Sequence, residues 1–196
     1  AGRVPGTMRD RGRPRPEHTG GIGISGLAAI ESFVEDGGTL IALNAASELP
    51  IQFLPIPVRN ALRPPSGAEG REEPPPATGT FYSPGSVLRV TVDPTHPIAF
   101  GMPKEAYAFS SGGYAFDVAG NSQGTTVIAR YAASNLLASG WLSGERAVLG
   151  KPLLVEAKLG KGRVVLFAFR PQHRGQTFGT FKFVLNTIYL ASAQPL

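Results

Sequence analysis

The feature that most constrains this chain is the segment from Leu159 to Leu190, which reads as a turn, a strand, a polar loop and a helix. Gly160-Lys161-Gly162 predicts a tight turn, because glycine adopts positive φ angles without a steric penalty. Val164–Phe169 is apolar at every position, as is typical of a strand covered on both faces. Such a strand needs a layer on each side of its sheet, so the segment predicts an α/β domain.

A polar loop follows that strand, where α/β sheets usually bind their ligands. The candidate site residues in it are Arg170, His173, Arg174, Gln176 and Thr177. They could bind an anion or a peptide carboxylate beside the next helix. Alternatively, Thr177 caps that helix and the arginines tie the loop to its neighbours or to a partner domain. Aromatic and aliphatic residues over 178–189 predict that the helix is mostly buried.

Composition excludes several classes of site. The chain has no cysteine, which excludes disulfides, thiolate metal ligands and a cysteine nucleophile. No apolar run approaches the roughly 18 residues of a membrane span. Of the net charge of +5, residues 1–16 carry +4, from five arginines against Asp10. This tail lacks interleaved aromatic residues, so we expect a solvated segment there and no nucleic-acid surface.

The sequence predicts a basic Arg/Pro-rich linker or loop over residues 1–17 and one α/β domain over residues 18–192. Residues 63–80 are rich in proline, glycine and glutamate, which predicts an exposed insertion. The domain begins with a helix that Ser25 caps and Gly37-Gly38 ends, followed by a short strand over residues 39–43. A doubly wound domain usually begins with βα units, so we expect the chain to be truncated at its N-terminus.

A further strand is expected within residues 81–92, and three more around residues 107–109, 126–131 and 153–158. In the first of these, Leu88, Val90 and Val92 form one apolar face by period-2 alternation. The last one pairs with residues 163–169 across the glycine turn as a hairpin. Together with the helices, these strands predict a mixed sheet flanked by helices.

Two other patterns carry little functional information. G-x-G-x-x-G is matched by Gly21, Gly23 and Gly26. Because no strand pattern precedes it, we expect a helix-entry loop there and no dinucleotide site. The three histidines are His18, His96 and His173. They lack the spacing of a zinc site, so no metal site is expected, and His96 in its turn is expected to cap or to hydrogen-bond at the surface.

A serine nucleophile is the remaining catalytic option. Ser47 follows the first strand and His173 follows the late strand, so both could reach the same edge of the sheet. Glu48 or Glu156 could orient the imidazole. Ser47 lacks the G-x-S-x-G context of a nucleophile elbow, and the alternative role of its hydroxyl is a helix N-cap.

A set of short segments is distinctive in combination. They are residues 20–23 (GGIG), 33–40 (FVEDGGTL), 47–50 (SELP), 82–86 (YSPGS), 96–103 (HPIAFGMP), 139–142 (SGWL), 160–167 (GKGRVVLF) and 169–174 (FRPQHR). Together they resemble the C-terminal, class I glutamine-amidotransferase-like domain of large bacterial zinc carboxypeptidases of the M14 family. The resemblance extends over roughly residues 18–191.

The resemblance implies a flavodoxin-like, class I glutamine-amidotransferase-like α/β fold. In that superfamily a cysteine occupies the sharp turn after the strand that follows the Gly-Gly helix end. The matching position here is Asn44, which cannot act as that nucleophile. His173 lies near the position of the superfamily's histidine, but without the cysteine the catalytic pair is broken, and no catalytic residue is expected.

The resemblance also implies where the peptidase chemistry lies. The zinc ligands and catalytic glutamate of such enzymes belong to the preceding domain, and no segment here matches their motif. We therefore expect no cofactor in this chain, zinc in the parent peptidase domain, a secreted or periplasmic parent, and that peptidase domain as partner, with no nucleic acid and no membrane.

The expected function is that of a non-catalytic accessory domain of, or split from, a bacterial zinc metallocarboxypeptidase. One alternative is a small-ligand, peptide or glycan-binding module that uses the loop over residues 170–177 together with Trp141. The other is a serine hydrolase that uses Ser47 and His173.

Overall fold

The computed structural model describes residues 21–63, 81–119 and 123–193, to which all structural statements refer. The predicted linker over residues 1–17 and nearly all of the predicted insertion over residues 63–80 lie outside these ranges. The truncation expected before residue 20 also concerns residues outside these ranges and stays a prediction.

Three helices and nine strands make up the described part of the chain. The helices are α1 (Gly23–Glu35), α2 (Glu48–Phe53) and α3 (Phe181–Ser192). The strands are β1 (Thr39–Leu43), β2 (Val58–Asn60), β3 (Ser86–Val92), β4 (Glu105–Ser110), β5 (Phe116–Val118), β6 (Thr125–Tyr131), β7 (Leu137–Ser139), β8 (Pro152–Leu159) and β9 (Gly162–Phe167). Short 3₁₀ turns are η3 (Asn44–Ser47), η4 (Pro97–Ala99), η5 (Glu145–Ala147), η6 (His173–Gly175) and η7 (Phe178–Thr180).

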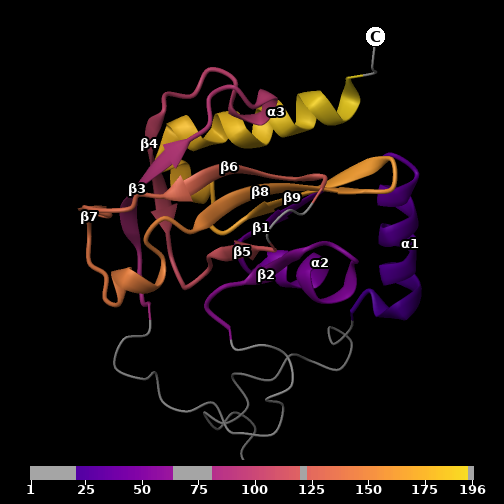
Figure 1. Ribbon diagram of the computed structural model, residues 1–196, viewed down its shortest axis with the longest axis horizontal. Coiled ribbons are helices and arrows are strands. Elements are labelled where there is room, and N and C mark those ends of the chain that lie inside the picture. Colours follow the sequence, from indigo (N-terminus) through magenta and orange to yellow (C-terminus); the bar gives the residue numbers. More distant parts are fainter. Residues whose placement is uncertain (1–20, 64–80, 120–122, 194–196) are drawn as a thin grey trace, which may run out of the picture.

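The elements form layers around one main sheet. Its strand order is β1-β9-β8-β6-β3-β4, and β7 also pairs with β3. Only β1 and β9 run parallel, and the other pairs are antiparallel. Helix α3 lies along one face of this sheet, while α2 and the small β2–β5 sheet lie on the other, and α1 stands beside the β8–β9 hairpin (Figure 1). The predicted mixed sheet flanked by helices is confirmed.

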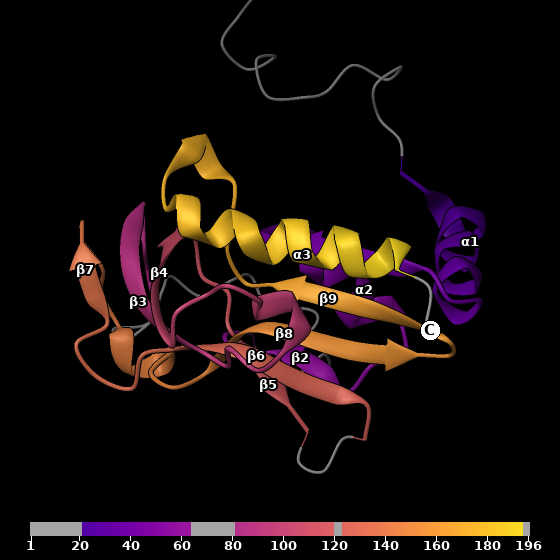
Figure 2. The same cartoon turned by 90° about the horizontal axis from the view of Figure 1, so that it is seen from above.

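The sheet is strongly twisted. Seen from above, β3 and β4 run steeply across the direction of β8 and β9 (Figure 2). This twist brings β4, the last strand in the order, close to the loop that follows β9, and His173 in that loop contacts Phe109 in β4. Sheet twist follows from the chirality of the residues.

The predicted hairpin is present, and its glycines have a second purpose. Leu159 pairs with Gly162, and Gly160 has a φ angle of 57°. The turn packs against the end of α1, where the Lys161 N–H donates to the carbonyl of Glu35 at 2.9 Å. A Cβ atom on Gly162 would overlap the carbonyl oxygens at the C-terminal end of α1 and in the Gly-Gly segment after it. The turn therefore needs glycine for its close approach to the helix end as well as for its geometry.

The core confirms the strand predictions. Every residue from Val164 to Phe169 is buried, although the strand itself ends at Phe167. Strand β3 buries Leu88, Val90 and Val92 on one face, as the alternation predicts. The strand begins at Ser86, inside the range in which it was predicted. Three strands were not predicted at all, β2, β5 and β7, because three residues are too few to show a period.

Two helix predictions are wrong. Helix α1 begins at Gly23 with Ile22 as its N-cap residue, so Ser25 lies inside the helix and caps nothing. Helix α3 is not mostly buried: among its residues only Phe183 and Thr187 are buried. The apolar residues on its other sides lie partly or largely in solvent. No helix in the described ranges combines the length and the apolarity that crossing a membrane requires.

Candidate functional site

A sharp elbow follows β1 at the position that the sequence assigned to the missing cysteine. Asn44 has a φ angle of 52° and begins η3 directly after the strand. A left-handed backbone costs a non-glycine residue roughly 1–2 kcal/mol, and asparagine is among the residues that adopt it most readily. The Asn44 side chain is only 3% exposed. Its Nδ2 donates to the carbonyl of Ser111 at 3.4 Å, and its buried Oδ1 accepts no hydrogen bond within the described ranges.

Ser47 does not occupy the role of a nucleophile. Its side chain is fully buried. Its Oγ lies 3.2 Å from the carbonyl oxygen of Ala42 and 3.1 Å from that of Phe167, so the hydroxyl donates to the ends of β1 and β9. It makes no side-chain cap for α2 either. The predicted cap is therefore wrong, and a fully buried hydroxyl that links two strand ends gives no support to the alternative of a nucleophile.

His173 lies in η6, where its ring stacks on Phe109 of β4 with centroids 4.5 Å apart and planes 2° from parallel. Neither carboxylate proposed to orient it does so. Glu48 accepts hydrogen bonds from Asn60 at 2.6 Å and Arg63 at 3.3 Å. Glu156 lies instead against His96 and Arg163 (closest N–O distances 3.7 Å).

The polar loop over residues 170–177 is held by a residue beyond it. Thr180 is fully buried, and its hydroxyl lies 2.8 Å from the carbonyl oxygens of Pro171 and Thr177. Thr177 caps no helix with its side chain, so the predicted capping role is wrong. The exposed candidates of this loop are Arg170, Arg174 and Gln176. Their predicted role in binding an anion or a peptide stays a prediction.

Backbone strain is concentrated at this corner. Asn44, Arg174 and Thr177 have φ angles of 52°, 49° and 52°, and the described ranges contain one further non-glycine residue with positive φ, Asn135. Such strain persists only where the surrounding structure enforces it, and functional sites are where it tends to occur. The elbow after β1 and the loop after β9 are therefore the strained edge of the sheet.

One segment joins the two strained parts. The end of β4 contributes the ring of Phe109 to His173 and, just beyond the strand, the carbonyl of Ser111 to Asn44. Sequence reasoning placed Asn44 and His173 at strand ends but assigned no role to this segment. No local signal could have found it, since β4 reaches the corner only through the twist of the whole sheet.

Trp141 lies at the same end of β3 and β4. Its backbone N–H donates to the hydroxyl of Ser86 at 3.0 Å, and Ser86 pairs with Ser110 of β4. The indole is exposed and packs edge-on against Tyr82, with centroids 5.8 Å apart. The glycan-binding alternative thus has an exposed aromatic pair at this end of the sheet, and it stays a prediction.

His96 behaves as the sequence predicts. Its Nδ1 accepts the N–H of Ile98 at 3.3 Å and so caps η4. In the neutral ring the proton is then on Nε2, which faces a carboxylate oxygen of Glu156 at 3.7 Å. Within the part of the chain that the structure describes, no three His, Cys, Asp or Glu side chains converge as a metal site would require.

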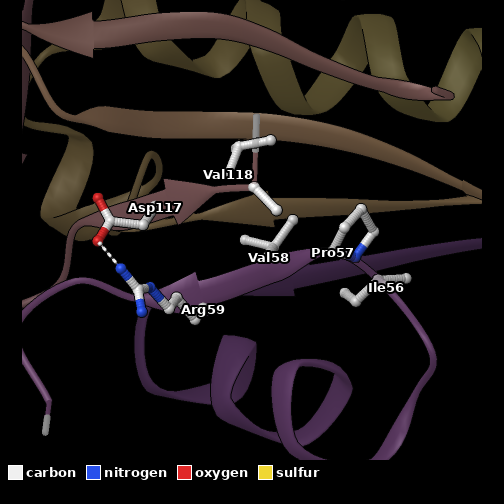
Figure 3. Close-up of a pocket in the computed structure, with 7 residues that line it drawn as sticks. Ile56, Pro57, Val58, Arg59, Asp117 and Val118 are labelled. Carbon is white, nitrogen blue, oxygen red and sulfur yellow. Dashed lines mark hydrogen bonds and ion pairs between the residues drawn. The ribbon is translucent and has the colours of Figure 1, made fainter. Parts of the chain in front are cut away.

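A pocket of about 440 Å³ lies elsewhere, at the β2–β5 sheet. It is lined by Ile56, Pro57, Val58, Arg59, Asp117, Val118 and Ala119. Figure 3 shows Arg59 and Asp117 pointing toward each other at one end of it. It contains none of the residues that the sequence singled out, and its charged side chains are engaged in ion pairs, since Asp117 also binds Lys151 at 2.7 Å.

The Asp117 cluster gives a pH-dependent prediction. Burial raises the pKa of this carboxyl, but hydrogen bonds and charges from Lys151 and Arg59 outweigh burial and hold the pKa below its ordinary value of 3.8. Its contribution to stability is therefore present above about pH 4 and is lost as the pH falls through the lowered pKa. We expect Asp117→Asn to lose about 0.5–1 kcal/mol at pH 7, a small effect because Arg59 is exposed. Urea titrations at pH 7 and near pH 2.5 should show this difference shrinking with acid, and a constant difference would contradict the prediction.

Comparisons with known proteins concern the fold alone. No protein-family model matches the chain, and no curated protein sequence does. A solved structure from Thermoplasma acidophilum, provisionally assigned as a GMP synthase subunit, superposes with a TM-score of 0.50 at 12% identity, over 86% of this chain and 65% of that one. Provisionally assigned ThuA-like proteins of Bacteroides uniformis and Parabacteroides merdae give a TM-score of 0.49 each, at 11% and 14% identity.

The chain thus spans about two thirds of the length of these structures, 65–68% of each, while 86–88% of its own length is covered. Identities this low say nothing of activity. Three observations support the same fold: the layers around the mixed sheet, the elbow after β1, and the likeness to the Thermoplasma acidophilum structure. The chain has a class I glutamine-amidotransferase-like fold.

Proposed function

We propose that this chain is a non-catalytic amidotransferase-like domain, which serves as an accessory domain of, or is split from, a bacterial zinc carboxypeptidase. One observation supports the loss of catalysis above all: the elbow after β1 carries Asn44, buried and hydrogen-bonded to Ser111. Glutamine hydrolysis in this class needs a thiolate at that position, and an amide nitrogen is no substitute because its lone pair is delocalised.

The surroundings of the elbow support the same proposal. A working elbow presents its nucleophile to substrate, whereas Asn44 is nearly inaccessible. His173, the remaining half of the superfamily's catalytic pair, packs its ring face on Phe109. The corner thus has the sharp backbone of such an elbow, while its two candidate side chains are engaged with the end of β4.

The accessory role is supported by the sequence segments that resemble zinc carboxypeptidases. In this proposal the peptidase domain carries the zinc and the chemistry, and the present domain packs against it or presents substrate to it. The exposed polar residues of the loop after β9, Arg170, Arg174 and Gln176, then form part of the docking surface.

The closed corner can be tested by cysteine chemistry, since the chain has no cysteine of its own. We expect a thiol introduced by Asn44→Cys to be alkylated at least ~10-fold more slowly than one introduced by Ala45→Cys, because Asn44 is buried and Ala45 is exposed. Iodoacetamide labelling followed by mass spectrometry measures both rates. A thiol at position 44 that reacts as fast as the one at position 45 shows an open elbow and contradicts the proposal.

Activity assays test the proposal directly. The purified chain should hydrolyse neither glutamine nor C-terminal peptide bonds, with or without added zinc. Asn44→Cys should not restore glutaminase activity, because the thiol would be buried and would lack a free imidazole. Zinc-dependent peptidase activity of this chain alone would overturn the accessory role.

A further inference from the structure

Helix α3 is attached to the sheet by a narrow part of its surface. Phe183 and Thr187 are its buried residues. On one flank, the Asn186 amide donates to the carbonyls of Ile98 at 3.0 Å and Phe100 at 2.9 Å, and Lys182 donates to that of Gly101 at 2.7 Å. These contacts fix the helix and its rotation, and they leave the opposite side facing outward (Figure 2).

The outward side of α3 is apolar. Leu185, Ile188 and Tyr189 lie there at helical spacing and are 52%, 52% and 72% exposed. Phe178, which is 74% exposed, extends this surface beyond the N-terminal end through its edge-on contact with Phe181. Phe100, 76% exposed, lies in the segment that Asn186 binds. We name these five exposed residues the α3 face.

The α3 face has almost no charge. The twelve residues of α3 include one side chain that is charged at neutral pH, Lys182, whose ammonium is bound to the carbonyl of Gly101 on the flank. Helices that are apolar on nearly all sides are usually covered by other parts of the protein on all sides. The sequence therefore predicted a mostly buried helix, and the described part of the chain covers only one side of it.

The size of the α3 face fits a contact between two proteins. An aromatic side chain offers roughly 150–250 Å², so its three aromatic residues, each about three-quarters exposed, present roughly 350–550 Å². With the two half-exposed aliphatic residues, one copy offers about 600 Å², at the upper end of what monomers leave uncovered. Two copies would bury about 1,200 Å², which reaches the range of specific interfaces.

We propose that the α3 face pairs with the same face of a second copy of this chain. A two-fold contact places the same patch of both copies face to face. The α3 face can pack against itself because it is apolar and uncharged, whereas a patch with charges of one sign would repel its own copy. Two α3 helices crossing near Leu185, which lies between Phe178 and Tyr189 along the α3 face, would bring the aliphatic residues together, with the aromatic residues around them. Such pairing is compatible with the accessory role and does not depend on it.

Sedimentation equilibrium of the whole chain between about 1 and 100 µM tests the pairing, because about 1,200 Å² is the low end of specific interfaces and this range covers micromolar dissociation constants. We expect a monomer–dimer equilibrium for the natural chain. Leu185→Glu and Ile188→Glu should each shift it at least ~10-fold toward monomer, since each places charges opposite their own copies. The matched control is Phe53→Glu, an equally exposed apolar position on α2 across the sheet, which should leave the dimer unchanged.

A second measurement serves if a glutamate variant fails to fold. Leu185→Cys should form an intermolecular disulfide under mild oxidation, because position 185 lies near the two-fold axis, whereas Phe53→Cys should stay monomeric. A natural chain that is monomeric at 100 µM overturns the proposal and leaves the α3 face to a different protein. A dimer that survives both glutamate substitutions, or equal cross-linking from positions 185 and 53, overturns it as well.

Discussion

Replacing Gly162 by alanine is expected to destabilise the folded chain by about 3 kcal/mol. The new methyl group would overlap the carbonyl oxygens of Val34 and Gly38, which are backbone atoms and cannot rotate away as a side chain can. Relief requires α1 to move off the hairpin, which would stretch the hydrogen bonds from Lys161 to Glu35 and from Arg163 to Gly38. Overpacking against flexible neighbours already costs about 1–3 kcal/mol, so a rigid neighbour places this variant at the upper end.

Urea or thermal unfolding at a fixed protein concentration measures this effect. The matched control is Gly179→Ala, because a Cβ atom at Gly179 has no neighbour within 4 Å and its φ angle is not in the positive region. That variant should stay within about 0.5 kcal/mol of the natural chain. If both alanine variants are equally stable, the packing of the hairpin turn on α1 is wrong.

Phe183→Ala is expected to cost about 3–5 kcal/mol, the range measured for removing a buried phenylalanine from a core. Phe183 is fully buried, and with Thr187 it forms the buried side of α3. Because the attachment of the helix is narrow, the loss should also loosen α3, and faster amide hydrogen exchange over residues 181–192 should report it.

Phe53→Ala is the control for this variant. Phe53 is 56% exposed on α2, so its removal leaves no cavity and should cost less than about 1 kcal/mol. Equal losses at positions 183 and 53 would contradict the packing of α3 on the sheet. A loss at position 183 without faster exchange in α3 would show that the flanking bonds of Asn186 and Lys182 suffice to hold the helix.

Local sequence signals were reliable where one short segment determines its own structure. The hairpin turn at Gly160, the buried run after it and the alternation in β3 were predicted correctly, because turn chemistry and side-chain period act over a few residues. Asn44 was placed correctly at a sharp turn after a strand. The cap at Ser25 was wrong, because the helix begins at Gly23, three residues earlier than a cap at Ser25 would place it.

The candidate site was predictable only in part. Its two strand-end segments were identified, but the partners within them were not. Ser47 was taken as a nucleophile or a cap, and it instead links two strand ends whose carbonyls converge only when β1 pairs with β9. His173 was predicted to lie near the place of the superfamily's histidine without a working partner, and the sequence did not show that its ring packs on Phe109, which is distant in sequence.

The sequence by itself determined the class of fold, the position of the elbow and the absence of a cysteine from it. Those properties follow from backbone preferences and residue identity, which are local. The tertiary structure alone decided that β4 reaches the strained corner, that Ser47 is enclosed, and that one side of α3 is left uncovered. These properties depend on the twist of the sheet and on which surfaces meet, and both arise from contacts between residues far apart in the chain.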